Sequence, residues 1–294
     1  MMDQAQNLRK YVEEYRKRKS NKVNKKIRII AVASGKGGVG KTNFSINVAI
    51  SLREMGNRVL VFDADLGLGN VDVVIGIVPK LTLYDVIYNH KEIDDIVING
   101  PEGIRIVPGG SGIETLANLD DMQRDNLSKK FERLLDTDIL IIDTGAGISK
   151  NVLSFIAASN ETIVVTTPEP TSITDAYSLI KVVLKYIPEK KINVIVNKVR
   201  DEKEATVTYK RLDTTVKKFL DKNIYNLGYI MEDARVKRSV MEQKPFKINY
   251  PNCSASKCID NIAHAISGLP DASKSTGGIR YFLNKVTYLF SKME

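Results

Sequence analysis

Apolar residues along the chain fall into short β-rich runs, separated by longer stretches with helical spacing. The helical spacing is clearest over residues 43–55 and 175–187. Strands that alternate with helices predict an α/β fold, a doubly wound and mostly parallel sheet with helices on both faces. Ligands of such sheets bind at the carboxyl ends of the strands. The predicted strands are residues 27–33, 58–63, 104–107, 138–143, 161–167, 191–197 and 225–230.

The two ends of the chain differ from this body. The first 26 residues begin with an amphipathic helical pattern and end in a polar, basic stretch. Near the other end, a turn-rich linker at residues 268–277 precedes a last short helix. We therefore expect an N-terminal segment 1–26, a body of residues 27–267 and a C-terminal segment 268–294.

The net charge of +9 is concentrated at the N-terminus, where residues 1–26 hold nine lysines and arginines against three acids. The rest of the chain has only a small positive surplus, which gives no support to a nucleic-acid-binding body. Because no apolar run is long enough to span a membrane and the N-terminus is polar, we expect neither a transmembrane helix nor a signal peptide. Cys253 and Cys258 are too few for a disulfide framework, so a cytoplasmic protein is the simplest interpretation.

The most informative motif is Gly-Lys-Gly-Gly-Val-Gly-Lys-Thr at residues 35–42, which fits the P-loop pattern G-x-x-x-x-G-K-[ST]. It follows a predicted strand and precedes a predicted helix, so backbone N–H groups and the helix dipole would face a phosphate. Lys41 is expected to reach the β- and γ-phosphates, and the Thr42 hydroxyl to hold Mg²⁺. The loop residues predicted to bind nucleotide are Gly35, Lys36, Gly37, Gly38, Val39, Gly40, Lys41 and Thr42.

Aspartates follow two other predicted strands. Asp63 and Asp65 stand at the end of the second strand, where two carboxylates are costly unless a metal, a water or a donor uses them. Asp143 ends the apolar strand 138–143 in a Walker B pattern, which places it in the Mg²⁺ shell of a P-loop protein.

An early lysine, Lys36, makes the loop resemble the deviant Walker A motif of the MinD/ParA class of P-loop ATPases, the SIMIBI type. Residues 63–70 are similar to the Asp-x-Asp-x-Gly-Leu-x-Asn segment of MinD-type proteins. The resemblance implies an ATP-bound homodimer in which this lysine acts on the partner's ATP, while Asp65 orients or deprotonates the attacking water. The catalytic residues that it implies are Asp65, Lys36 and Lys41. The Mg²⁺ ligands that it implies are Thr42, Asp63 and Asp143.

The base-binding segments favour ATP. Asn197 ends a predicted strand in Asn-Lys-Val-Arg, whereas guanine-specific proteins use Asn-Lys-x-Asp; here Arg200 replaces the carboxylate that selects guanine. Asp201 follows one place later and keeps guanine open as an alternative. MinD-type proteins use the asparagine for adenine, which implies the same role for Asn197. Residues 228–233 resemble their second base-contacting loop, which implies a contact from Asp233, although the usual proline of that loop is absent.

The C-terminal segment ends in a basic amphipathic helix, predicted over residues 279–293. Its apolar side chains fall within roughly 120° of arc, and Arg280, Lys285 and Lys292 lie outside it. This pattern suits an interfacial membrane anchor, which the MinD family carries, and two anchors in an ATP dimer would add avidity. A helix packed on its own domain has the same pattern and is the alternative. The residues predicted to contact the membrane are Ile279, Phe282, Leu283, Val286, Leu289 and Phe290.

The N-terminal residues Asp-Gln-Ala-Gln-Asn-Leu-Arg, at positions 3–9, match the Asp-Gln-Ala-x-x-Leu-Arg element of the FlhG (YlxH, FleN) branch of this family. In that branch the element is an activator helix for FlhF, a flagellar GTPase of the signal-recognition-particle type. A frayed basic tail is the alternative. The residues that the resemblance implies in partner binding are Asp3, Gln4, Ala5, Leu8, Arg9 and Lys181.

Together these features predict an FlhG-like ATPase that uses ATP and Mg²⁺, dimerises on ATP and lies on the inner membrane surface when ATP-bound. It would regulate flagellum number or placement through an FlhF-type GTPase and flagellar basal-body components, with no nucleic acid partner. The alternatives are a MinD-type division-site regulator, a ParA-like DNA-partitioning ATPase and an iron–sulfur carrier. The C-x₄-C spacing of Cys253 and Cys258 differs from the C-x-x-C of such carriers, so two free thiols are expected.

Overall fold

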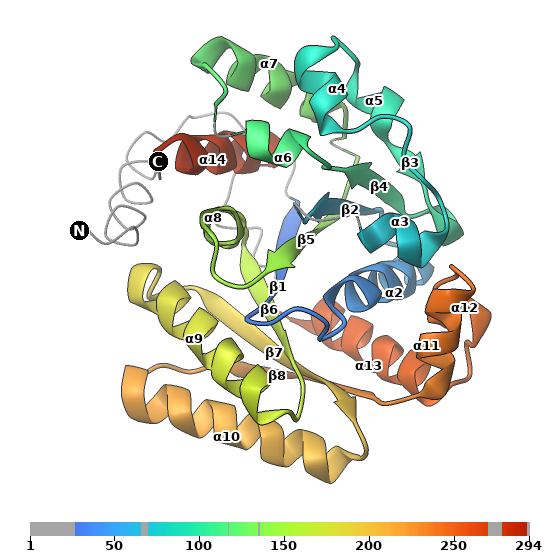
Figure 1. The fold of residues 1–294 in the computed structure, drawn as a ribbon, viewed down its shortest axis with the longest axis vertical. Coiled ribbons are helices and arrows are strands. Elements are labelled where there is room, and N and C mark those ends of the chain that lie inside the picture. The colour runs from blue at the N-terminus through green and yellow to red at the C-terminus, as the bar shows by residue number, and fades with distance from the viewer. Residues whose placement is uncertain (1–26, 66–69, 117, 135, 270–277, 293–294) are drawn as a thin grey trace.

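The computed structural model describes residues 27–65, 70–116, 118–134, 136–269 and 278–292. Their strands form one eight-stranded sheet in the order β3-β4-β2-β5-β1-β6-β7-β8, in which only the β3–β4 pair is antiparallel (Figure 1). This confirms the predicted fold class and all seven predicted strands, while the two-residue β3 was not predicted. The strands are β1 (Arg28–Ser34), β2 (Val59–Ala64), β3 (Ile98–Asn99), β4 (Arg105–Pro108), β5 (Ile139–Ala146), β6 (Glu161–Thr166), β7 (Lys191–Val199) and β8 (Tyr225–Met231).

Helices cover both faces of the sheet (Figure 1). On one face lie α2 (Lys41–Glu54) and α13 (Ser254–Gly268), and on the other lie α8 (Lys150–Ala158) and α9 (Pro170–Tyr186). The helix α10 (Glu202–Leu220) packs against α9 and β7. The remaining helices are α3 (Asn70–Ile75), α4 (Leu83–Tyr88), α5 (Ile93–Ile96), α6 (Gly112–Thr115), α7 (Asp121–Phe131), α11 (Ala234–Met241), α12 (Phe246–Asn249) and α14 (Ile279–Lys292).

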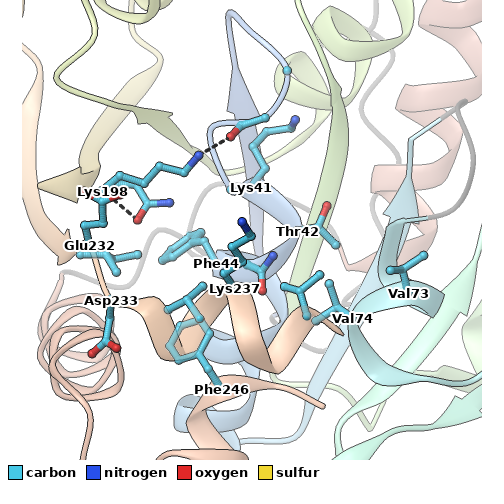
Figure 2. Close-up of a pocket in the computed structure, with 18 of the residues that line it drawn as sticks. Lys41, Thr42, Phe44, Val73, Val74, Lys198, Glu232, Asp233, Lys237 and Phe246 are labelled. Atoms are coloured by element: carbon cyan, nitrogen blue, oxygen red, sulfur yellow. Dashed lines mark hydrogen bonds between the residues drawn. The ribbon is translucent and has the colours of Figure 1, made fainter. Parts of the chain in front are cut away.

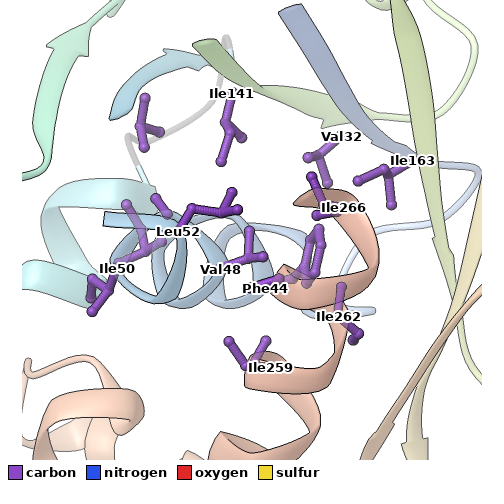
Figure 3. Packing of buried hydrophobic residues seen from close by; sticks show 14 of the residues in the cluster. Val32, Phe44, Val48, Ile50, Leu52, Ile141, Ile163, Ile259, Ile262 and Ile266 are labelled. Carbon is purple, nitrogen blue, oxygen red and sulfur yellow. The ribbon is translucent and has the colours of Figure 1, made fainter. Parts of the chain in front are cut away.

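The core is built from alternating strand residues. Side chains of a strand point alternately to the two faces, so Ile30 of β1 joins the α2–α13 side and Ile29 the opposite side. On the first side, Phe44 of α2 packs against Ile262 of α13 beneath the sheet (Figure 3). Burying a side chain of this size stabilises the fold by about 1.5–3 kcal/mol. This packing fixes the start of α2, and with it the phosphate loop.

The C-terminal helix α14 is part of this core. It packs on α7 and α8, where the Phe290 and Phe155 rings lie 5.4 Å apart. Arg280 pairs with Asp125 and Glu132 of α7 and the adjoining turn. The six side chains predicted to contact a membrane are all buried here: Ile279, Phe282, Leu283, Val286, Leu289 and Phe290.

In the structure, α14 thus packs on its own domain, which was the alternative to a membrane anchor. Lys285, predicted outside the apolar arc, is also buried and donates to the Ala157 carbonyl at 2.5 Å. Membrane contact stays a prediction, and it requires α14 to leave this position. Within the described ranges, none of the helices combines the length and apolar character needed to cross a membrane. The predictions for residues 1–26 fall outside the described residues, as do residues 270–277 of the linker predicted over 268–277. Gly268, its first predicted residue, is the last residue of α13.

Candidate nucleotide-binding site

A cavity of about 700 Å³ opens at the carboxyl ends of the strands, beside the loop that joins β1 to α2. Lys41, Thr42 and the β8–α11 segment line it (Figure 2). Asp65 belongs to the same lining. The loop enters α2 through Gly40, whose φ of 94° is left-handed and therefore suits glycine. The first N–H groups of α2 lack intrahelical partners, which makes this end of the cavity suited to an anion.

Two loop glycines are required by what packs behind them. A Cβ atom on Gly35 would lie 2.1 Å from the Asp175 carbonyl oxygen of α9, and one on Gly40 would lie 2.4 Å from Nδ2 of Asn197. Around Gly37, by contrast, there is open space. The loop is therefore held directly against α9 and β7.

Asn197 and Lys198 brace the loop from the end of β7. Asn197 Nδ2 donates to the Val39 carbonyl at 2.7 Å. Lys198 Nζ donates to the Gly38 carbonyl at 2.9 Å (Figure 2). Lys198 adopts a left-handed φ of 59°, uncommon for a residue with a side chain. Asn197 lines the cavity as predicted, but its amide nitrogen is already used by the loop, and its adenine contact stays a prediction. The sequence analysis did not predict that Lys198 braces the loop, although the Asn-Lys dipeptide at the end of β7 could have indicated it.

Asp233 lines the outer part of the cavity, where it was predicted to contact the base. It caps α11 by accepting from the Arg235 N–H at 3.0 Å, and the Arg235 guanidinium binds both its oxygens at 2.8 and 2.9 Å. These bonds to Arg235 hold the pKa of Asp233 below its ordinary value. The carboxylate is thus committed to this helix start, and its contact with a base stays a prediction.

Asp63 and Asp143 lie side by side on β2 and β5, paired in the sheet register. Both are buried, at 6% and 0% exposed. Burial, and next the charge of Asp143, raise the pKa of Asp63 to about 7. Burial also raises the pKa of Asp143, opposed by the Thr42 hydroxyl and the charge of Lys41. The Asp65 N–H, beside them, donates to Asp63 Oδ1 at 3.3 Å.

This carboxylate pair fits a Mg²⁺ site. Two buried negative groups repel each other, and Oδ2 of Asp143 is buried with no hydrogen-bond partner in the described part of the chain. Nowhere in that part do three acidic, histidine or cysteine side chains converge. Mg²⁺ is commonly bound through only one or two carboxylates together with waters and substrate phosphates. Thr42, Asp63 and Asp143 would hold the ion, which would neutralise phosphate charge when bound.

Lys36 lies outside the cavity of its own chain. Its Nζ atom donates to Glu169 Oε2 at 2.9 Å and to Thr171 Oγ1 at 3.2 Å, at the start of α9. The pair is exposed, and Lys36 lowers the pKa of the Glu169 carboxyl. Sequence reasoning gave Glu169 no role. The geometry separates this lysine from Lys41, which lines the cavity.

Lys181, predicted to bind a partner, is exposed on α9, away from the cavity. Nearby on the α9–α10 surface, the Tyr177 and Phe219 rings meet edge to face at 6.5 Å. Phe219 is 64% exposed, unusual for such an apolar side chain. Cys253 and Cys258 are both buried, and Cys253 Sγ caps α13 by accepting from the Ser256 N–H. That capping contact gives Cys253 a structural role.

Residues 30–246 match the CobQ/CobB/MinD/ParA nucleotide binding domain. The parallel sheet, the loop between β1 and α2, and the aspartates at the strand ends agree with that match. The chain therefore belongs to the CobQ/CobB/MinD/ParA family of P-loop nucleotide-binding proteins.

Within this family the chain is similar to flagellar regulators. It is 38% identical over 261 residues to the antiactivator FleN of Pseudomonas aeruginosa, covering 88% of this chain and 93% of FleN. It is 37% identical to the flagellum site-determining protein YlxH of Helicobacter pylori, covering 88% and 86%. MinD from Pyrococcus horikoshii, solved with Mg-ADP, superposes with a TM-score of 0.66 at 27% identity, covering 82% of this chain and 96% of that one. The predicted resemblance to the FleN and YlxH branch is confirmed.

Proposed function

We propose that this protein is an ATP-hydrolysing switch that regulates the number or placement of flagella. The similarity to FleN and YlxH along 88% of the chain carries the proposal. The nucleotide site supports it, because Lys41 and Thr42 line a cavity that also contains Asp65. Asp65 would orient the attacking water, and the buried pair Asp63 and Asp143 would hold Mg²⁺.

ATP would close two copies of the chain into a homodimer. The position of Lys36 supports this step, since its amine lies outside its own cavity and forms exposed contacts with Glu169 and Thr171. An exposed pair of this kind is worth little, so the lysine can exchange it for a phosphate of a partner's ATP. In that role Lys36 acts in trans, as an arginine finger does.

Hydrolysis would then open the dimer, which a variant of Asp65 tests. We expect Asp65→Ala to bind ATP but to stay dimeric, whereas the wild type returns to monomer as ATP is consumed. Light scattering after size exclusion, with phosphate release measured in parallel, follows both events. Asp94→Ala, an exposed aspartate of α5 that does not line the cavity, is the control. An Asp65→Ala dimer that dissociates as fast as the wild type would contradict the assigned role.

The ATP dimer would also bind the inner membrane surface through α14. The six large apolar side chains of α14 support this, but they must first leave α7 and α8. The chain contains no tryptophan, so one introduced by Phe290→Trp is a unique reporter. With anionic vesicles containing brominated lipid, ATP is expected to quench its fluorescence, and ADP is not. Phe131→Trp, in the core at the end of α7, is the matched control, and equal quenching of both variants would contradict membrane insertion.

Two surfaces are proposed for partners. The residues Asp3, Gln4, Ala5, Leu8 and Arg9 would stimulate an FlhF-type GTPase, and exposed Lys181 with Phe219 would receive a basal-body component. GTP hydrolysis by such a GTPase, with the full chain and with its Gln4→Ala variant, tests the first surface. We expect stimulation that the variant loses. Stimulation that survives Gln4→Ala would contradict the assignment of this residue.

The regulatory role itself is tested in cells. We expect loss of the gene, or Lys41→Ala, to change the number or position of flagella counted by electron microscopy. A MinD-type division-site regulator would instead change cell length and produce minicells. Normal flagella with misplaced septa would replace the flagellar proposal by that alternative.

A further inference from the structure

A serine outside the P-loop pattern contacts the metal-site carboxylate Asp143. Ser45 lies on α2, one helical turn beyond Thr42, and its Oγ donates to Asp143 Oδ1 at 2.8 Å. Both residues are fully buried, at 0% exposure. Residues three apart on a helix share a face, so Thr42 and Ser45 approach β5 together.

The surroundings of Ser45 indicate that its hydroxyl has a role beyond packing. The neighbours of Ser45 on α2, Phe44 and Ile46, are apolar and buried, and a buried hydroxyl is costly unless it forms hydrogen bonds. A serine hydroxyl can donate one hydrogen bond, and Ser45 donates it to Asp143. The bond fixes one carboxylate oxygen. The other, Oδ2, is buried and has no hydrogen-bond partner in the described ranges.

We propose that Ser45 is a positioning residue for the Mg²⁺–nucleotide complex: it holds Asp143 by Oδ1, so that Oδ2 stays available to the metal site. The inference rests on the proposed nucleotide site and adds a residue to it. The Thr42 hydroxyl also lies against this carboxylate, but Thr42 is itself a proposed metal ligand. Without the serine, Oδ1 loses its bond from the Ser45 hydroxyl, and the Asp143 carboxylate could rotate about its side-chain bonds and lose its alignment. Partners of this kind, one bond removed from the metal, typically change metal affinity by about 10–100-fold when mutated.

The same helix provides a matched control. Ser51 lies further along α2, is 3% exposed and donates to Asp260 Oδ1 at 2.6 Å. It is therefore also a buried serine bonded to a carboxylate, but Asp260 belongs to α13 and does not line the cavity. A purely structural serine–carboxylate bond at position 45 would behave like the one at position 51.

The test is a Mg²⁺ titration of full-length protein with a fluorescent ADP analogue, because ADP avoids both hydrolysis and ATP-dependent dimerisation. We expect Ser45→Ala to raise the Mg²⁺ concentration at half-saturation about tenfold. ADP affinity in EDTA and the melting temperature should change no more than they do in Ser51→Ala. Ser45→Thr, which keeps the hydroxyl, should titrate close to the wild type.

Two results would overturn the inference: a Ser45→Ala midpoint equal to that of the wild type, or an equal shift in Ser51→Ala. If Ser45→Ala does not fold, Ser45→Cys replaces it. The thiol is a weaker donor of similar size, so its midpoint should rise, and an unchanged midpoint would again overturn the inference. A wild type that binds ADP with no Mg²⁺ dependence would instead contradict the proposed site as a whole.

Discussion

Two fully buried carboxylates lie at opposite ends of two central strands of the sheet and differ in how they are hydrogen-bonded. Glu161, at the start of β6, accepts from Arg28 Nε at 2.6 Å and from Asn193 Nδ2 at 3.0 Å, so both its oxygens are bonded. Asp143, at the carboxyl end of β5, is bonded through Oδ1 and leaves Oδ2 without a partner in the described residues. The burial is the same, but only the second carboxylate keeps an oxygen for a ligand.

The surroundings of the two groups differ in the same way. Around Glu161 the negative charge is fully compensated, since Arg28 binds it and Lys191 lies 3.9 Å away. Beside Asp143 stands Asp63, a second buried acid. A closed ion pair can be purely structural, whereas an excess of buried negative charge needs a cation from outside. The comparison therefore separates a structural carboxylate from a site, and three substitutions test it.

The largest effect on stability is expected at Glu161, the carboxylate in a closed ion pair. Arg28→Met leaves Glu161 buried without its main cation, and we expect the free energy of unfolding to fall by about 3–5 kcal/mol. Denaturant unfolding measures the loss. Arg58→Met is the control, because Arg58 pairs with Asp138 at the surface, and this variant should unfold close to the wild type. A similar, small loss in both variants would show that Glu161 does not depend on its ion pair.

At the metal site, a substitution of Asp63 is expected to stabilise the protein instead. The pKa of Asp63 is raised to about 7, so its ionisation opposes folding, and the cost grows as pH rises toward 7. In EDTA and without nucleotide, Asp63→Asn should increase the free energy of unfolding by about 2 kcal/mol above pH 7. The gain should shrink under mildly acidic conditions, where Asp63 is already protonated. Asp221→Asn, at the exposed C-terminal end of α10, is the control, and a gain that does not depend on pH would contradict the argument.

The smallest effect concerns an exposed carboxylate, Glu169, which pairs with Lys36. Glu169→Gln should leave thermal unfolding unchanged, because the pair is solvent-exposed. It should release Lys36 for a partner's nucleotide and tighten ATP-dependent dimerisation about twofold to fivefold, the range of one exposed ion pair. Sedimentation at several protein concentrations measures this, with Glu204→Gln removing another exposed pair as the control. Weaker dimerisation would mean that Glu169 serves the dimer.

The sheet was predictable because its central strands are buried on both faces and form apolar runs in the sequence. All seven predicted strands are present, with ends shifted by at most three residues. The edge strand β3 has only two residues, Ile98 and Asn99, too few to form a pattern. At the site, the P-loop and Asp143 were predictable because phosphate binding demands a fixed motif and buried acids at strand ends are costly.

The rest depended on contacts between distant segments. The spacing of apolar residues in α14 is the same whether a membrane or α8 covers them, so only the fold shows which surface is buried here. The ion pair of Asp233 with Arg235 and the bond from Ser45 to Asp143 likewise leave no motif. The first contact was indicated only by an arginine close after a helix cap. The second was indicated only by one polar residue on a buried helix face.

The glycines of the phosphate loop have a consequence for mutational tolerance. Gly35 is excluded from change by the α9 backbone and Gly40 by Asn197, whereas a side chain at Gly37 meets open space. Saturation mutagenesis of the loop, scored by folding of the ligand-free protein, should therefore find position 37 permissive and position 35 intolerant even of alanine. Intolerance at position 35 would arise from the join between the loop and α9, the helix that carries Lys181, and would appear even in assays that contain no phosphate.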